Sequence, residues 1–231
     1  MTTVEIDIET ARREFRDQLI GAGLLIPMGI DGLFGRGAVF ENVIDGIDVA
    51  VRRKGRAVHG DSATVLRFPP LFSREAFEGT DYIASFPNLT GSIATFTGGD
   101  REHRDLLEDR AAGNGWDHHL HPAGTMLVSA ACHPSYSTLD PQLPADGRLL
   151  DVYGYCFRHE PAIDPARMQA FRMHEYVRVG TPEQAIEHRE KWIGHGLEVL
   201  AALGRFDAGH IALMIGDGDP GLAATLNGTI R

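Results

Sequence analysis

The chain has 231 residues, 43% hydrophobic and 23% charged, which is the composition of an ordinary globular protein long enough to bury one sizeable core. Its formal net charge of −10 at pH 7 argues against a nucleic acid as the main ligand, because phosphate binding needs a broad basic face. The sequence shows no apolar run long enough to span a bilayer, no signal-peptide pattern and only two cysteines, so we expect a cytoplasmic protein without membrane contact.

Residues 1–70 predict two helices and a strand. A helix is expected from Thr10 to Ile20, and a second from Ala38 to Lys54, where apolar residues recur on one helical face. Gly55 is expected to stop the second helix. The glycine-rich stretch between the helices, LLIPMGIDGLFGRG, predicts a loop; it is not a P-loop, since no Gly-Lys-Ser/Thr follows. A strand over 63–68 then runs into Pro69-Pro70.

The middle of the chain predicts short elements and one exposed helix. Ser73 is suited to cap a short helix that reaches Phe77. The stretch 82–91 predicts a strand or a loop, and 92–97 predicts a strand. The charged stretch 98–115 predicts an exposed helix that ends in glycines.

Three histidines follow that helix: His118, His119 and His121. Clustered histidines bind zinc in many proteins, and on a strand His119 and His121 would face the same way. The alternative is a group of surface histidines that bind no metal.

The stretch 149–179 predicts a hairpin of two strands joined by a polar loop. The first strand is expected to reach Glu160, with Arg158 and Glu160 on one face, and Phe171 and Glu175 would share a face of the second. A guanidinium can hold a phosphate, an aromatic ring can stack on adenine and a carboxylate can accept from an exocyclic amine, so the set suits a nucleotide site. A salt-bridged surface hairpin is the other interpretation of the spacing.

A helix with strong start signals follows the hairpin. Thr181 is its N-cap, Pro182 takes the first helical position and Gln184 completes a capping box. Its apolar face is expected to consist of Ala185, Ile193, Leu197 and Leu200, and Gly204 is expected to end it.

Three separate blocks carry a resemblance to a known family. Phe157-Arg158-His159-Glu160, followed after a loop by Phe171-x-x-x-Glu175, resembles motif 2 of the class II aminoacyl-tRNA synthetases. The longer text around it, with the blocks 66–91 and 128–136, is similar to the amino acid:[carrier protein] ligases, which in turn resemble the atypical archaeal seryl-tRNA synthetases.

The resemblance implies one catalytic domain over residues 1–231, with an α/β (α+β) fold in which an antiparallel sheet is flanked by helices. Residues 1–35 would be an N-terminal helix and loop, 36–70 would correspond to motif 1, which builds a homodimer interface in that family, and 149–179 to motif 2. Residues 204–231 would be a divergent tail. The glycine-rich motif 3 of the family is not found, so the domain is expected to be cut short.

The resemblance also implies the chemistry. ATP with Mg²⁺ and a small amino acid, such as glycine or alanine, would give an aminoacyl-adenylate, which the phosphopantetheine thiol of an acyl carrier protein captures. Arg158 and Glu160 would be the catalytic residues, Arg158 on the α-phosphate and Glu160 on the adenine. Arg167 and Met168 match ATP-contacting positions, and Phe171 would stack on the adenine.

Two residues match zinc ligands of the family, Cys132 and Glu175. The zinc there takes the amino group of the substrate, and a thiolate and a carboxylate are suitable donors. The third ligand of the family is a later cysteine, which this sequence lacks, and His210 is a conceivable substitute. The family requires no histidine in the 118–121 cluster, which favours surface histidines there. Cys156 has no such role and is expected in the core.

Two further functions stay open. The first is a truncated, catalytically inactive paralogue that acts as a dimerising or carrier-protein-binding module, which the lack of motif 3 favours. The second is a seryl-like aminoacyl-tRNA synthetase. It is disfavoured by the acidity of the chain, because the basic cluster from Arg52 to Arg56 is interpreted as a solvated helix end, so no tRNA partner is expected.

Overall fold

The structure is a computed structural model, and it describes residues 7–203. The first elements in chain order, with η for a 3₁₀ helix, are α1 (Ile8–Gly21), β1 (Leu25–Pro27), β2 (Phe34–Arg36), α2 (Ala38–His59), β3 (Thr64–Leu66), β4 (Leu71–Ser73), α3 (Arg74–Glu78), α4 (Tyr82–Ser85), η1 (Pro87–Leu89) and β5 (Ser92–Phe96). They are followed by α5 (Asp100–Ala111), η2 (Asp117–His119), β6 (Leu120–Leu127), α6 (His133–Tyr136), β7 (Arg148–Phe157), β8 (Ala170–Val179) and α7 (Pro182–Leu203).

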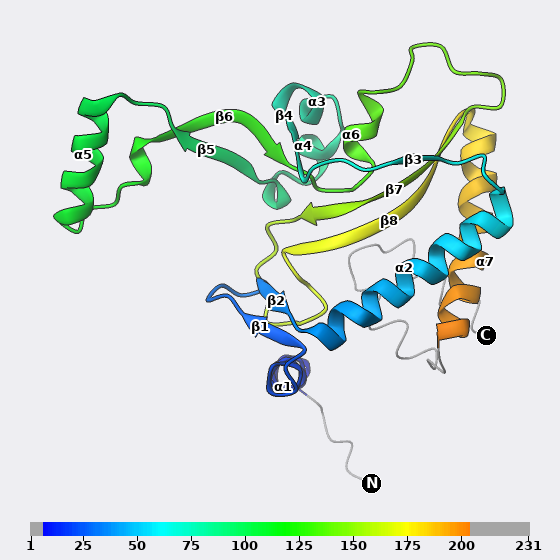
Figure 1. The fold of residues 1–231 in the computed structure, drawn as a ribbon, viewed down its shortest axis with the longest axis horizontal. Coiled ribbons are helices and arrows are strands. Elements are labelled where there is room, and N and C mark those ends of the chain that lie inside the picture. Colours follow the sequence, from blue (N-terminus) through cyan, green and yellow to red (C-terminus); the bar gives the residue numbers. More distant parts are fainter. Residues whose placement is uncertain (1–6, 204–231) are drawn as a thin grey trace, which may run out of the picture.

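The strands of this part of the chain form three small sheets, in the orders β1-β2, β3-β7-β8 and β4-β6-β5. The β3-β7-β8 sheet lies at the centre, with α2 and α7 beside it, and the β5–β6 ribbon extends away from it as an arm that carries α5 at its tip (Figure 1). No helix within residues 7–203 is long and apolar enough to cross a membrane.

The central sheet is built on the predicted hairpin. Strands β7 and β8 pair antiparallel along their whole length, from Arg148 opposite Val179 to Phe157 opposite Ala170. Strand β3 pairs parallel to β7, so this sheet is mixed, whereas the other two sheets are antiparallel.

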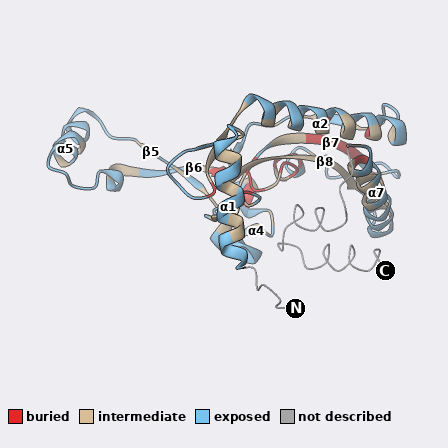
Figure 2. Ribbon diagram, turned by 90° about the horizontal axis from the view of Figure 1, so that it is seen from below, coloured by how far each residue is buried: buried red, intermediate tan, exposed pale blue. Residues whose placement is uncertain are grey.

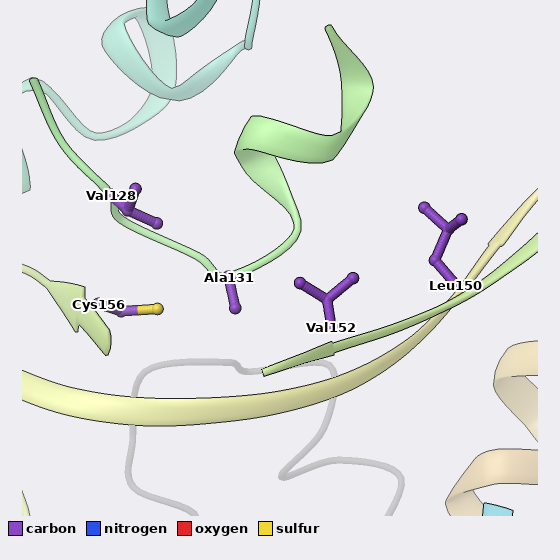
Figure 3. Close-up of a cluster of buried hydrophobic side chains, with 5 residues drawn as sticks. All are labelled: Val128, Ala131, Leu150, Val152 and Cys156. Atoms are coloured by element: carbon purple, nitrogen blue, oxygen red, sulfur yellow. The ribbon is translucent and has the colours of Figure 1, made fainter. Parts of the chain in front are cut away.

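One face of the hairpin packs against the segment 128–139 and forms the core. Side chains alternate between the faces of a strand, so every second residue of β7 faces this side. The buried cluster consists of Val128, Ala131, Leu150, Val152 and Cys156 (Figure 3). Buried residues concentrate along β7, and the arm is largely exposed (Figure 2). The prediction that Cys156 lies in the core is confirmed.

Helices α2 and α7 pack against the opposite face of the hairpin. The side chain of His174 in β8 is 7% exposed and lies between two carboxylates, with Nδ1 at 2.7 Å from Asp48 of α2 and Nε2 at 3.2 Å from Asp151 of β7. Tyr176 of β8 stacks on Trp192 of α7, with ring centroids 4.5 Å apart. The two helices are thus held by polar and aromatic contacts as much as by aliphatic packing.

Helix α2 runs past Gly55 to His59, so the predicted stop at Gly55 is wrong. Gly55 is buried where α2 crosses β8, and a Cβ at this position would overlap the Tyr176 hydroxyl. Close approach of a side chain, rather than helix termination, therefore requires this glycine. The helix ends at Gly60, whose φ of +59° is a conformation that glycine adopts readily. Arg52 and Lys54 consequently lie within the helix, where they pair with Asp48 and Glu198.

The start of α7 is as predicted, and its buried face is so in part, since Ile193, Leu197 and Leu200 are partly buried. Thr181 N–H donates to Gln184 Oε1 (3.0 Å) and Gln184 N–H donates to the Thr181 hydroxyl (3.3 Å), which completes the capping box. Ala185 is exposed, whereas Trp192 packs on β8 and Val199 is buried. Aromatic rings fill this contact, and an aliphatic pattern does not reveal them. The predicted end at Gly204 lies outside the described residues.

Two segments form more structure than the sequence predicted. The glycine-rich stretch before α2 folds as the β1–β2 hairpin, whose turn includes Gly29 and Gly32 at φ of +82° and +74°. The stretch 82–91 forms α4 and η1 in place of a strand or loop. It does so because Tyr82 packs on the buried Phe77, at 6.0 Å between ring centroids. The predicted cap of α3 is confirmed, since Ser73 Oγ accepts from Ala76 N–H (3.1 Å).

Candidate functional site

The site residues of the first strand lie just beyond its end. The ladder stops at Phe157, so the prediction that Arg158 and Glu160 share a strand face is wrong. Arg158 N–H still donates across the hairpin to Gln169 O (2.9 Å), and the bond from Glu160 N–H to Arg158 O (2.7 Å) then closes a tight turn. The two side chains are therefore placed by this turn and not by strand alternation.

Arg158 meets Phe171 beside the core. Its guanidinium carbon is 5.4 Å from the centre of the Phe171 ring, within the range of a cation–π contact. Its Nε donates to the carbonyl oxygen of Ser129 (3.1 Å). Within residues 7–203 the guanidinium forms no ion pair with a carboxylate, so its charge is available to an anionic ligand.

The loop between the strands contributes a second pair of charges. Arg167 forms an ion pair with Glu160, and both side chains are partly exposed. Met168 lies apart from this pair, and its sulfur accepts from Arg36 Nη2 of β2 (3.6 Å). The structure thus brings together Arg158 with Phe171 and Glu160 with Arg167, and it places Met168 against the β1–β2 hairpin.

Both ends of this loop are fixed to segments distant in the sequence. Gln169 is 4% exposed; its N–H donates to Gly32 O and its side-chain Nε2 to Asp31 O, both at 2.7 Å. At the other end, His159 N–H donates to Leu89 O of η1 (2.9 Å). The β1–β2 turn and η1 therefore hold the base of the loop that carries Arg167.

Cys132 and Glu175 lie next to each other on the core side of β8. Cys132 N–H donates to Glu175 Oε1 (3.1 Å), and the Tyr136 hydroxyl donates to the Cys132 sulfur (3.4 Å). Burial, with the neighbouring Glu175 carboxylate, raises the pKa of the Cys132 thiol to about 12. The thiol is therefore protonated at neutral pH when the protein is alone, and a bound cation would favour the thiolate.

A thiol and a carboxylate in contact are a suitable start for a zinc site, and a firm site takes three or four protein ligands. Cys132 and Glu175 have no third histidine, cysteine or carboxylate within ligating reach in residues 7–203. His210, the substitute suggested by the sequence, lies outside the described residues. A thiolate and a carboxylate are both ordinary zinc ligands. The described residues therefore supply two of the three or four protein ligands that a firm zinc site needs.

Three buried polar atoms near Arg158 lack a hydrogen-bond partner among the described residues: Tyr82 Oη, Ser129 Oγ and His133 Nδ1. Tyr82 and His133 are in edge contact, with ring centroids 5.4 Å apart, and the Arg158 charge acts on both rings. Buried polar groups are seldom left unpaired, so their gathering here marks a place where a polar ligand is expected. Sequence reasoning missed all three, although Ser129 and His133 lie in the block 128–136.

The histidine cluster differs from the sequence-based geometry. His119 and His121 do not lie on one strand as expected; His118 and His119 instead approach Asp109 of α5. The prediction paired the histidines along a strand, whereas His118 and His119 belong to the 3₁₀ turn η2 and only His121 lies on β6.

Comparison with solved structures defines the class of fold. The chain superposes on the seryl-tRNA synthetase of M. kandleri, solved with A. aeolicus tRNASec, with a TM-score of 0.63 and 20% identity over 80% of this chain and 37% of that one. It also superposes on the prolyl-tRNA synthetase of Giardia lamblia in complex with prolyl-adenylate, with a TM-score of 0.58 and 13% identity over 87% of this chain and 37% of that one. The fold is that of the class II aminoacyl-tRNA synthetases.

Within that class, the sequence is similar to two ligases of Bradyrhizobium diazoefficiens. Amino acid–[acyl-carrier-protein] ligase 1 is 36% identical over 180 residues, which are 77% of this chain and 54% of the ligase. Amino acid–[acyl-carrier-protein] ligase 2 is 35% identical over 179 residues, 77% of this chain and 52% of the ligase. The chain thus spans about half the length of these relatives. The resemblance to the amino acid:[carrier protein] ligases that was inferred from the sequence is thus confirmed. No protein-family model matches the chain.

Proposed function

We propose that the chain activates a small amino acid with ATP as an aminoacyl-adenylate and transfers it to the phosphopantetheine thiol of an acyl carrier protein. The observation that supports this best is the gathering of a guanidinium without an ion pair among residues 7–203, an aromatic ring, a thiol and a carboxylate at the core side of one hairpin. These are Arg158, Phe171, Cys132 and Glu175. The chain that presents them is similar to two amino acid–[acyl-carrier-protein] ligases.

In the first step, the amino acid carboxylate attacks the α-phosphorus of ATP, an O–P bond forms and pyrophosphate leaves. Charge accumulates on the phosphoryl oxygens, so a preorganised cation lowers the barrier. Arg158 would supply that cation and orient the two anionic reactants. Adenine would stack on Phe171, whose ring the guanidinium now covers at 5.4 Å, so we expect Arg158 to move toward the phosphate when ATP binds.

Glu160 and Arg167 would act together on the nucleotide. Their ion pair holds the Glu160 carboxylate in place. This carboxylate could accept a hydrogen bond from the adenine amine, and the positive Arg167 could face the phosphates. In the second step, the carrier thiol attacks the carbonyl carbon of the adenylate, a thioester forms and AMP leaves.

Cys132 and Glu175 would hold a zinc ion together with ligands from outside the described residues. A zinc there supplies an open coordination position for the substrate amine. Mg²⁺ would bind with the ATP phosphates, as hard cations prefer oxygen. Met168, in contact with Arg36, would serve the site only by holding the loop against β2.

Amino acid-dependent exchange of pyrophosphate into ATP tests the first step. We expect exchange with one small amino acid in the presence of Zn²⁺ and Mg²⁺. Arg158→Ala should lower the exchange rate by at least about 100-fold, because a cation that contacts the phosphoryl oxygens in the transition state contributes several kcal/mol. Arg189→Ala on the exposed surface of α7 is the matched control and should leave the rate unchanged.

Absence of exchange with every amino acid, from protein shown to be folded, would contradict the ligase proposal. The chain would then be a binding module, the second candidate, which the presence of only two zinc donors at the hairpin among residues 7–203 favours. Binding of a carrier protein without exchange would support that module. Exchange followed by transfer to tRNA, and not to a carrier protein, would instead identify a tRNA-charging enzyme.

A further inference from the structure

The tip of the arm formed by β5, α5, η2 and β6 contains a hydrogen-bonded turn at the end of α5. Helix α5 stops in a double hydrogen bond, in which Gly113 N–H donates to Arg110 O (3.3 Å) and Asn114 N–H donates to Asp109 O (2.9 Å). Gly113 has a φ of +77°, which makes this the common glycine-terminated end of a helix. The turn brings the chain back toward Asp109 of the last helical turn.

Two imidazoles meet the Asp109 carboxylate at this turn. His119 Nε2 is 2.8 Å and His118 Nε2 is 3.3 Å from the same oxygen, Asp109 Oδ2. The ligand atoms of the three residues all lie within 4.8 Å of one another. The other oxygen of the carboxylate, Oδ1, accepts from the side-chain amide of Asn114 (3.1 Å), which turns Oδ2 toward the imidazoles.

These separations suit a tetrahedral metal ion. With metal–ligand bonds of about 2.0–2.1 Å, two ligand atoms of a tetrahedral site are about 3.3 Å apart. The distances of 2.8 and 3.3 Å are close to that value, so small side-chain shifts would admit an ion. Two imidazoles and a carboxylate select zinc-like transition metals over Mg²⁺ and Ca²⁺, which prefer oxygen ligands.

We propose that the tip of the arm binds a divalent transition metal of the zinc class through Asp109 Oδ2, His118 Nε2 and His119 Nε2. Each imidazole would give its Nε2 lone pair to the metal and keep its proton on Nδ1, so the ion replaces the imidazole–carboxylate hydrogen bonds. Asn114 would orient the carboxylate from outside the coordination sphere. A fourth position stays open to water, because the His118 side chain is 63% exposed.

The metal would cross-link α5 to η2, the turn that precedes β6. The arm has little core of its own, since no residue of α5 is buried. A cross-link at its tip therefore stabilises a segment that packing alone holds weakly. The site stands away from the hairpin in Figure 1, and it does not depend on the proposed ligase activity.

The experiment is a Zn²⁺ and Co²⁺ titration of the full chain that carries Cys132→Ser, which removes the thiol of the hairpin. We expect one equivalent of metal per chain by calorimetry, and a cobalt absorption spectrum of nitrogen and oxygen ligands. His119→Ala or Asp109→Asn should abolish this equivalent. Asn114→Ala should keep it and weaken the affinity by about 10- to 100-fold, as loss of an outer-shell partner does.

His121→Ala is the matched control, a neighbouring exposed histidine outside the cluster, and should bind as the parent does. Circular dichroism without metal should be the same for all variants, which separates loss of binding from loss of folding. No binding by the Cys132→Ser chain, or binding that survives Asp109→Asn and His119→Ala together, would overturn the proposal.

Discussion

Individual side chains between the hairpin and α2 are in close contact. Tyr176 illustrates this best: it stacks on Trp192, lies at 5.4 Å from the His174 ring and occupies the space beside Gly55. A single methyl group at Gly55 would therefore displace several partners at once, because packed interiors adjust little.

Gly55→Ala is expected to lower the free energy of unfolding by about 1–3 kcal/mol, as overpacking does. Gly46→Ala on the same helix is the control, since a Cβ there meets nothing within 4 Å. That change should raise the free energy of unfolding by about 0.5–1 kcal/mol through helix propensity. Urea denaturation of both variants measures the difference. Equal effects at the two positions would show that Gly55 does not serve packing.

The family resemblance named the residues of the candidate site, and tertiary contacts decide which of them meet. The Cys132–Glu175 contact was anticipated only by family resemblance, because these residues lie in separate segments of the chain. Arg158 was expected on a strand, and nothing local in the sequence shows that the ladder stops at Phe157. Ser129 was missed because a serine in an apolar run carries no signal until its surroundings are known.

At the scale of elements, local rules succeeded where the determining contacts are local. The hairpin followed from alternation, and the start of α7 followed from Thr181 and Gln184, which bond to each other. The contact between α7 and β8 was not predicted, because it depends on rings from three elements. In that contact, His59 of α2 accepts a hydrogen bond at Nε2 from the Trp192 indole (3.0 Å).

This hydrogen bond predicts a pH dependence. Burial, with the nearby charges of His188, His195, Arg178 and Lys191, lowers the pKa of His59 below its ordinary value of 6.5. The unfolded chain therefore binds a proton more readily than the folded one, so stability is full above pH 6.5 and falls as the pH drops toward the folded pKa. Burial lowers the pKa of His188 as well, which adds to the slope in the same direction.

We expect the free energy of unfolding to fall between about pH 7 and pH 5.5, with a shallower slope in His59→Gln. Glutamine keeps an acceptor for the indole and does not titrate. His103→Gln, at an exposed position on α5, is the control. Denaturation curves followed by Trp fluorescence at several pH values give the slopes. If stability depended equally steeply on pH in His59→Gln and in the parent, His59 would not be a source of the pH dependence.

At the scale of the whole molecule, exposed apolar side chains gather on the β1–β2 hairpin and on the start of α2. Ile26, Met28 and Ile30 are 51%, 59% and 60% exposed, and Val39 and Val43 are 64% and 57% exposed. Concentrations of large apolar side chains at a surface commonly mark an interface with another chain. The start of α2 also lies in the stretch 36–70, whose resemblance to motif 1 predicts a homodimer interface, so we propose that a homodimer forms here.

Val43→Glu is expected to convert a dimer into a monomer, because it places a charge within an apolar interface. Ile186→Glu on α7 is the control, an exposed residue of similar size on another element. Sedimentation velocity at micromolar concentration reports the state of each. A parent chain that sediments as a monomer would contradict the proposed dimer.

The anchoring of the loop between β7 and β8 has a thermodynamic consequence. Gln169 and His159 fasten its two ends to the β1–β2 turn and to η1. A segment tied at both ends samples fewer conformations than a free one, so a ligand that orders it loses less entropy on binding. Changes at Asp31 or Gly32, whose carbonyl groups accept from Gln169, would therefore act on affinity by loosening the tether.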